Sequence, residues 1–234
     1  MTQVYAHRGL HTALRENTVA AFRAAVAMGV DGVELDVRET ADGVLVVHHD
    51  PVADSHVIAT SPASSLPDYV PSLDEALEAC QGVHVNVEIK NSREPGETYD
   101  DTGRVARAVV ERVHEVGETH DVTFSCFDLA TCRVVRSCAA SVRVGFLVDA
   151  SHDVLEALHQ AHDAGLDAVH PQVTMMTNEV MVVSRELGLS LCTWTVNSPV
   201  EMAAQAAWGV DALITDDPAT ALRLFGRAKG PHEL

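Results

Sequence analysis

One five-residue joint occurs three times in this chain of 234 residues. The copies are Gly29-Val30-Asp31-Gly32-Val33, Gly165-Leu166-Asp167-Ala168-Val169 and Gly209-Val210-Asp211-Ala212-Leu213. Each has a glycine after a helical pattern, then an apolar residue, an aspartate, a small residue and the start of an apolar run. Glycine suits the left-handed backbone that ends many helices. Three such joints predict a repeated strand–helix unit.

Strand and helix patterns alternate along the rest of the chain. Short apolar runs predict strands at 3–6, 33–37, 83–89, 121–125, 142–148, 167–170, 189–195 and 211–215. Helical spacing of apolar residues predicts one helix that begins after a cap at Asn17 or Thr18 and stops at Gly29. It predicts further helices at 72–80, 102–116, 128–138, 152–163, 178–187, 199–207 and 218–228. Eight such units imply an α/β fold with a parallel sheet closed into a (β/α)₈ barrel of the TIM type. A doubly wound open sheet is the alternative that the element order leaves open.

No linker is long enough to divide the chain, so residues 1–234 are expected to form a single domain. A further extended run at 44–47 follows the second strand. Residues 51–70, rich in Ser, Pro and Ala, are expected to form an irregular loop, a short insertion that caps the active site.

Glu34 and Asp36 are the most informative acidic residues. They stand two positions apart in a strand whose other residues are apolar, so both carboxylates project from the same face. In a barrel of this kind the active site lies where the strands end, and the acids should face that mouth. Glu88, in the third strand, would supply another oxygen ligand. Carboxylates without nearby cysteine suit a hard cation, Mg²⁺ or Ca²⁺.

Other polar residues come directly after predicted strands, where the mouth of the barrel is expected. His7 precedes Arg8 and Gly9 at the end of the first strand, which makes it an acid–base candidate. His48 and His49 should point to opposite faces, so at most one of them reaches the site. Lys90 follows Glu88 by two positions, and a surface ion pair is the alternative for these two. Trp194 is a candidate for substrate binding, with plain core filling as an equally open interpretation.

These residues together closely resemble the glycerophosphodiester phosphodiesterase family. The matching stretches run in order along almost the whole chain: His7-Arg8-Gly9, Glu16-Asn17-Thr18, Gly32-Val33-Glu34-Leu35-Asp36-Val37, His49-Asp50-Pro51, Asn86-Val87-Glu88-Ile89-Lys90, Trp194-Thr195-Val196-Asn197 and Thr215-Asp216-Asp217-Pro218. The resemblance implies an enzyme that cleaves glycerophosphodiesters to glycerol 3-phosphate and an alcohol with one divalent cation, Mg²⁺ or Ca²⁺.

By position, the resemblance makes His7 and His49 the two catalytic histidines. It makes Glu34, Asp36 and Glu88 the metal ligands, and it gives Arg8 and Lys90 the phosphate-side contacts. Trp194 is assigned to substrate binding.

The chain departs from the family pattern at two places. The segment after Pro51 is short and lacks the arginine and threonines that relatives often carry there, and Arg15 stands where a proline usually precedes Glu16.

The expected substrate is a small molecule. A lysophospholipase D-like enzyme and a non-catalytic barrel that binds phosphorylated metabolites are the two alternatives.

Composition excludes several other classes. The formal net charge of −18 repels phosphate backbones, so no nucleic-acid partner is expected. The five cysteines form no C-x-x-C pair, which favours a reducing compartment. There is no signal-peptide pattern at the start, and no apolar run approaches a membrane span, so we expect a cytoplasmic protein without stable membrane insertion. The sequence leaves the oligomeric state open.

Overall fold

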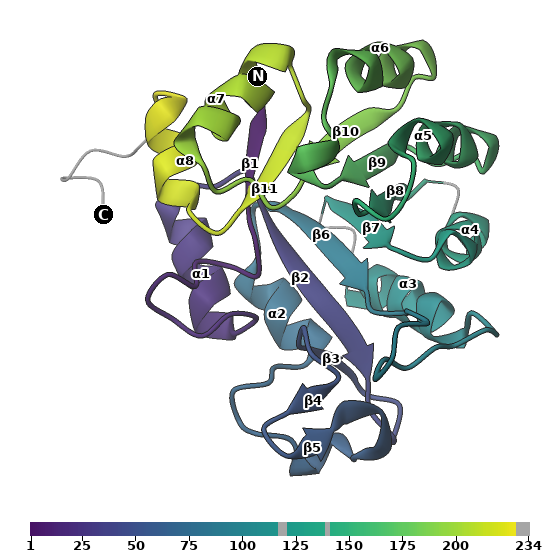
Figure 1. Cartoon of the computed structure of the whole chain (residues 1–234). Helices are drawn as coiled ribbons and strands as arrows, with labels where there is room; N and C mark the ends of the chain where they lie inside the picture. Colours follow the sequence, from purple (N-terminus) through teal and green to yellow (C-terminus); the bar gives the residue numbers. More distant parts are fainter. Residues whose placement is uncertain (117–120, 139–140, 228–234) are drawn as a thin grey trace.

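A closed parallel barrel forms the centre of the molecule in the computed structural model, which describes residues 1–116, 121–138 and 141–227 (Figure 1). Strand β1 pairs in parallel with both β2 and β11, and this double pairing closes the sheet. The closed ring confirms the predicted (β/α)₈ barrel and excludes the open sheet. Its strands are β1 (Gln3–Ala6), β2 (Gly32–Glu39), β6 (His84–Ile89), β7 (Val122–Cys126), β8 (Arg143–Val148), β9 (Ala168–Pro171), β10 (Ser190–Thr193) and β11 (Ala212–Thr215).

Helices surround the barrel and alternate with its strands (Figure 1). The main apolar core includes residues from the outer faces of the strands, such as Leu35, and from the helices, such as Phe22 and Leu77. Within the described ranges no helix has the length and apolar character needed to cross a membrane. The helices are α1 (Val19–Met28), α2 (Leu73–Ala79), α3 (Arg104–Val116), α4 (Leu129–Cys138), α5 (Val154–Asp163), α6 (Asn178–Glu186), α7 (Pro199–Trp208) and α8 (Pro218–Leu224).

Most predicted elements lie within two residues of their observed bounds, and the largest difference is at the last helix. It ends at Leu224, where a run to residue 228 was expected. Residue 228 itself is outside the described residues.

The three repeated joints share one hydrogen-bonding pattern. Their glycines have positive φ values of 89°, 68° and 80° at positions 29, 165 and 209, which is the left-handed backbone predicted for them. Each aspartate then accepts a hydrogen bond from an amide N–H of a neighbouring strand. Asp31 bonds Val4 at 2.7 Å, and Asp167 and Asp211 bond Val144 and Leu191 at 2.8 Å each. The aspartate therefore ties the entry of one strand to the strand beside it.

An insertion follows β2 at its carboxyl end (Figure 1). It begins with β3 (Leu45–Val47), which pairs antiparallel with β2. Residues 51–70 were expected to be irregular, but they contain the antiparallel strands β4 (Val52–Ala53) and β5 (His56–Val57) and two short 3₁₀ turns. A separate apolar cluster of Val46, Ala53 and Ile58, with Leu66 and Val70 packed against it, holds this insertion together.

Candidate active site

Three carboxylates lie side by side on β2 and β6. Glu34 and Asp36 alternate with the apolar residues of β2 and turn away from the outer core, as their spacing predicted. In the parallel register Asp36 is the direct partner of Glu88 on β6. All three are buried, with exposed fractions of 2%, 1% and 9%, and their nearest carboxylate oxygens lie within 4.8 Å of one another.

Burial and mutual repulsion make this cluster costly without a cation. Burial, and then the charge of Asp36, raise the pKa of Glu34. Burial also opposes ionisation of Asp36, but Lys90 and Arg8 outweigh it and hold the pKa of Asp36 well below its usual range. Glu34 Oε1 and Asp36 Oδ1 are buried and accept no hydrogen bond from the described residues. Oxygens of this kind at this spacing fit a hard divalent cation.

Two cationic side chains border the carboxylates. The Arg8 guanidinium lies 3.3 Å from Asp36 and 2.9 Å from Glu16, and the Arg8 amide donates to Glu34 at 3.0 Å. Lys90 Nζ lies 2.8 Å from Glu88 and 3.5 Å from Asp36. Burial opposes the charge of Lys90, but these two acids raise its pKa, so the ammonium group stays protonated. The acids therefore hold both cations beside the cavity.

The backbone turn after β1 places His7 at the mouth of the barrel. The His7 amide donates to the Thr215 carbonyl of β11 at 3.0 Å, and Arg8 takes a left-handed conformation with φ of 54°. Gly9 follows, where a Cβ would lie 2.8 Å from the backbone of Ala21, so only glycine lets this loop approach α1. The local chain path therefore depends on the Arg-Gly pair after the histidine.

The His7 ring bridges two acids. Nδ1 lies 2.6 Å from Asp216 Oδ1, and Nε2 lies 3.9 Å from Glu34 Oε2. Burial opposes the charged ring, but the hydrogen bond to Asp216 and the charge of Glu34 raise the pKa of His7. Burial likewise opposes ionisation of Asp216, while its hydrogen bonds with His7 and Asn197 lower its pKa, so Asp216 is a carboxylate at neutral pH.

The two adjacent histidines separate as the strand alternation predicted. His49 lines the cavity with His7, and its Nδ1 lies 2.8 Å from Asp50. The His48 ring instead lies near the ring of Tyr69, with 6.3 Å between centroids, and its Nδ1 contacts the Asp50 carbonyl at 2.9 Å.

Arg38 is a residue near the site that the sequence analysis missed. Its buried guanidinium donates to the backbone carbonyl of His49, with Nε at 2.9 Å, and pairs with Glu97 at 2.7 Å. It therefore fixes the chain that carries His49. The signal was present, because Arg38 continues the alternation of Glu34 and Asp36 and must share their face.

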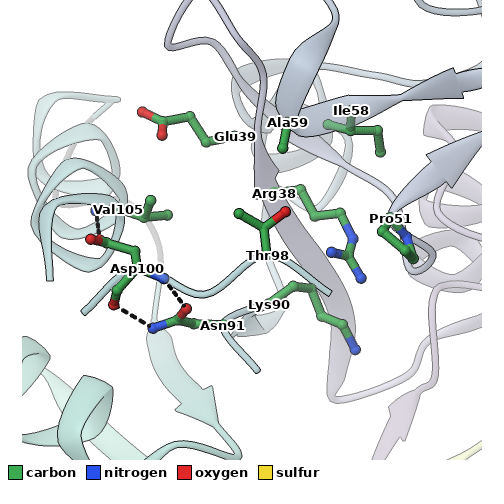
Figure 2. A pocket seen from close by; sticks show the side chains of 10 residues that line it. All are labelled: Arg38, Glu39, Pro51, Ile58, Ala59, Lys90, Asn91, Thr98, Asp100 and Val105. Carbon is green, nitrogen blue, oxygen red and sulfur yellow. Dashed lines mark hydrogen bonds between the residues drawn. The ribbon is translucent and has the colours of Figure 1, made fainter. Parts of the chain in front are cut away.

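A small cavity beside Arg38 is distinct from the catalytic mouth. Figure 2 shows Arg38 and Lys90 among the side chains around this space of about 40 Å³, with Asn91 bonded to Asp100 at its edge. The volume accommodates a few water molecules at most, so the substrate cannot bind there.

The cavity at the mouth of the barrel brings most of the predicted residues together. It has a volume of about 110 Å³, and its wall includes seven of the eight predicted site residues: His7, Arg8, Glu34, His49, Glu88, Lys90 and Trp194. Asp36, the eighth, is buried and contacts two of the lining residues, Arg8 and Lys90. A larger cavity of about 530 Å³ adjoins it and shares His49, Glu88, Lys90 and Phe127.

Trp194 combines the two interpretations that the sequence left open. It is half-buried, donates from Nε1 to the His170 carbonyl at 2.7 Å and meets the edge of Phe127. The same ring forms part of the cavity wall. Packing therefore fixes an aromatic surface at the site.

Comparisons with known proteins agree with this architecture. Residues 7–220 match the glycerophosphoryl diester phosphodiesterase family. A glycerophosphodiester phosphodiesterase of Caldanaerobacter subterraneus subsp. tengcongensis is 29% identical and covers 95% of this chain and 97% of its own length. Another, from Bacillus altitudinis, is 26% identical, with coverages of 96% and 98%.

Solved structures show the same fold. A phosphodiesterase of Oleispira antarctica in complex with the product sn-glycerol-3-phosphate superposes with a TM-score of 0.83 at 20% identity, covering 97% of each chain. The glycerophosphodiester phosphodiesterase of Agrobacterium tumefaciens superposes with a TM-score of 0.78 at 24% identity, covering 97% of this chain and 100% of its own.

Proposed function

Because the chain belongs to the glycerophosphoryl diester phosphodiesterase family, whose members are phosphoric diester hydrolases, we propose that it hydrolyses glycerophosphodiesters to glycerol 3-phosphate and an alcohol. The observation that carries this proposal is one cavity lined by two histidines, two cations and buried carboxylates. Family membership favours this enzyme over a non-catalytic barrel. The product bound by the Oleispira antarctica relative supports a small-molecule substrate.

Glu34, Asp36 and Glu88 would hold one divalent cation in this proposal. Their converging oxygens fit Mg²⁺ or Ca²⁺, and two of these oxygens, Glu34 Oε1 and Asp36 Oδ1, are buried and accept no hydrogen bond from the described residues. When bound, such an ion polarises phosphoryl oxygens as a Lewis acid. Arg8 and Lys90 border the same oxygens and would neutralise charge that grows on the phosphoryl group as it is attacked.

His7 and His49 would move the protons of the reaction. Both line the cavity, and in both rings Nδ1 is engaged by an aspartate, Asp216 and Asp50 respectively. The remaining nitrogen, Nε2, is therefore the atom that can exchange a proton with the substrate. One histidine would take a proton from the attacking oxygen, and the other would give one to the leaving alcohol. The attacking oxygen is either the neighbouring glycerol hydroxyl, through a cyclic phosphate, or water.

Two aromatic side chains of the cavity suit the parts of the substrate other than the phosphoryl group. Trp194 and Phe127 form a fixed apolar corner of the cavity, against which the glycerol carbons or the alcohol can pack. We therefore assign Trp194 to substrate binding within this proposal.

A cytoplasmic location is also part of the proposal. The five cysteines are free thiols, and four of them are buried within the fold. Free thiols are typical of a reducing compartment.

Release of glycerol 3-phosphate from glycerophosphocholine tests the proposed function. The purified protein is assayed as isolated, with excess EDTA, and after addition of Mg²⁺ or Ca²⁺ in excess over the chelator. We expect turnover to disappear with EDTA and to return with the cation. Full activity in excess chelator would rule out the metal site. Failure to release glycerol 3-phosphate from glycerophosphocholine, glycerophosphoethanolamine and glycerophosphoglycerol would defeat the proposed activity.

A further inference from the structure

We propose that Asp216, oriented by Asn197, is the positioning residue of His7: it fixes the His7 ring and its tautomer so that Nε2 faces the substrate. This inference rests on the proposed function for its catalytic meaning. Asp216 follows the last strand of the barrel and lies 209 positions from His7. It lies outside the wall of the catalytic cavity and acts through His7 alone.

The distance between the two groups indicates a short, charge-assisted hydrogen bond. His7 Nδ1 and Asp216 Oδ1 are 2.6 Å apart, and the His7 side chain is 18% exposed. An ionised carboxylate can only accept, so the proton of this bond belongs to His7 Nδ1. The neutral ring then has its lone pair on Nε2, and the protonated ring has its second proton there. In either catalytic role, His7 exchanges protons through Nε2.

Asn197 fixes the orientation of the aspartate. The Asp216 amide N–H donates to Asn197 Oδ1 at 2.9 Å, and the Thr215 hydroxyl donates to the same oxygen at 3.2 Å. Because a backbone N–H can only donate, the oxygen of the Asn197 amide must lie on this side. Its NH₂ group therefore faces Asp216 Oδ2, at 2.6 Å. One carboxylate oxygen is held by Asn197, and the other is left for His7.

His11 completes the surroundings of Asp216. Its Nε2 lies 3.1 Å from the same Oδ1 atom that contacts His7. The three groups lie close enough to suggest a metal site. Bonds of about 2.0 Å in a tetrahedral site, however, separate two ligand atoms by about 3.3 Å. The 2.6 Å between His7 and Asp216 is shorter and fits a hydrogen bond.

The substitution Asp216→Asn tests the tautomer directly. With Asn197 unchanged, the new side-chain oxygen should face the Asn197 NH₂, and the new NH₂ should face His7 Nδ1. That nitrogen must then accept, which moves the single proton of neutral His7 to Nε2 and removes the lone pair from the substrate side. We expect kcat to fall on the order of a hundredfold or more, the scale of general acid–base catalysis, with KM nearly unchanged.

A double-mutant cycle separates positioning from a general structural role. If Asp216 acts through His7, the double variant His7→Ala with Asp216→Asn should have the kcat of His7→Ala within about twofold, because the two effects are not additive for coupled residues. The matched control is Asp217→Asn. Asp217 is adjacent in sequence but caps α8 through Thr220, and asparagine is also a good cap, so this variant should retain wild-type kcat.

A spectroscopic measurement makes the test independent of turnover. Long-range ¹H–¹⁵N correlation spectra of ¹⁵N-histidine-labelled protein report the tautomer, and the spectrum of His7→Gln identifies the His7 signals. We expect the Nδ1–H form in the wild type and the Nε2–H form in Asp216→Asn. Three results would each overturn the proposal. The first is an Nε2–H form in the wild type, and the second is wild-type kcat in Asp216→Asn. The third is that Asp216→Asn lowers kcat by the same factor in the His7→Ala background as in the wild type. Inactivity of the wild type would defeat the proposed function, while the spectra would still decide the role of Asp216.

Discussion

Adjacent residues of the same type have different surroundings at the mouth of this barrel. His49 faces the cavity, whereas His48 lies beside Tyr69 in the insertion. The difference follows from the alternation of side chains in an extended chain, which separates neighbours onto opposite faces. Arg38 then fixes the arrangement, because its guanidinium donates to the His49 carbonyl.

This separation predicts unequal effects of two matched substitutions. We expect His49→Ala to lower kcat on the order of a hundredfold or more, because it removes a group that transfers a proton. His48→Ala removes a ring outside the cavity and should lower the melting temperature while kcat stays near the wild-type value. Steady-state kinetics and thermal unfolding of both variants check the prediction. Equal, large losses of kcat would show that the assignment of His49 is wrong.

The carboxylate cluster gives a second prediction at this scale. In the wild type, Mg²⁺ or Ca²⁺ should raise the melting temperature, because binding at about 100 times Kd stabilises the folded state by roughly 2.7 kcal/mol. Glu34→Gln should remain folded without cation, since it removes buried like-charge repulsion, but should lose this increase.

Glu39→Gln is the matched control for the cation experiment. Glu39 ends the same strand but pairs with Arg104 outside the catalytic cavity, so the increase should persist in this variant. Differential scanning fluorimetry with a cation titration measures the melting temperature of the wild type, Glu34→Gln and Glu39→Gln. An undiminished increase in Glu34→Gln would contradict the predicted ligand set.

At the scale of elements, each repeated joint connects a helix to a strand and also to the neighbouring strand. Asp211 accepts a hydrogen bond from the amide of Leu191, and the Asp211 amide donates to the Leu191 carbonyl at 3.0 Å. Asp31 and Asp167 make the equivalent pair of bonds, both amides donating at 3.0 Å to Val4 and Val144. The aspartate in the repeated sequence therefore helps to set strand order around the barrel.

Removal of one such aspartate should weaken the fold without changing catalysis. Asp211→Ala leaves the Leu191 amide without its acceptor, so we expect a loss of about 1–2 kcal/mol in the free energy of unfolding. Asp211→Asn retains a side-chain oxygen and should lose less than half as much. Urea unfolding monitored by circular dichroism gives both values. If Asp211→Asn lost as much free energy of unfolding as Asp211→Ala, the charge of Asp211, and not its hydrogen bond, would be the stabilising feature.

The insertion after β2 follows His49, and none of residues 51–70 is among those that line the two cavities at the mouth of the barrel. Its bulky apolar residues are already engaged: Ile58 is 1% exposed within the insertion's own cluster, and the Tyr69 ring lies 3.7 Å beneath the Arg15 guanidinium. Arg15 therefore joins the loop after β1 to the insertion. Val52 and Val57 remain exposed, but two valines cannot enclose an acyl chain.

We therefore expect small water-soluble diesters to be the preferred substrates. An acyl chain needs a continuous apolar wall, because each buried CH₂ contributes only about 0.8 kcal/mol. The comparison is kcat/KM for glycerophosphocholine against lysophosphatidylcholine below its micelle concentration, so that the choline group is constant. A clear preference for the lipid would support the lysophospholipase D-like alternative.

Sequence reasoning predicted the barrel well because its signals are local and repeated. The joints at Gly29, Gly165 and Gly209 fix helix ends, and alternation in β2 predicted which face carries Glu34. The hairpin within 51–70 was missed because its strands are only two residues long and have no periodicity to detect. Asp216 follows the last predicted strand in a stretch that matches the family, but its contact with His7 depends on barrel closure, which no local pattern encodes.

At the scale of the whole molecule, closure of the barrel brings its first and last strands together at the site. β1 pairs with β11 over four residues, and this pairing places His7 beside Asp216. The resulting cavity holds local cations on a molecule whose formal net charge is −18. With a divalent cation on the three carboxylates, the local field of that ion, Arg8 and Lys90 would attract an anionic substrate, while the distant field repels it.

These opposing fields predict a salt effect that depends on substrate charge. Screening lengths fall from about 30 Å at 0.01 M salt to about 8 Å at 0.15 M, so added salt suppresses the distant repulsion while the short contacts to Arg8 and Lys90 change less. With the divalent cation kept saturating, kcat/KM for anionic glycerophosphoglycerol should rise about two- to tenfold between about 0.01 and 0.15 M NaCl. Zwitterionic glycerophosphocholine, measured in the same buffers, is the control and should change little. A fall of kcat/KM for the anionic substrate alone would show that the local cations, and not the net charge, govern its approach to the barrel mouth.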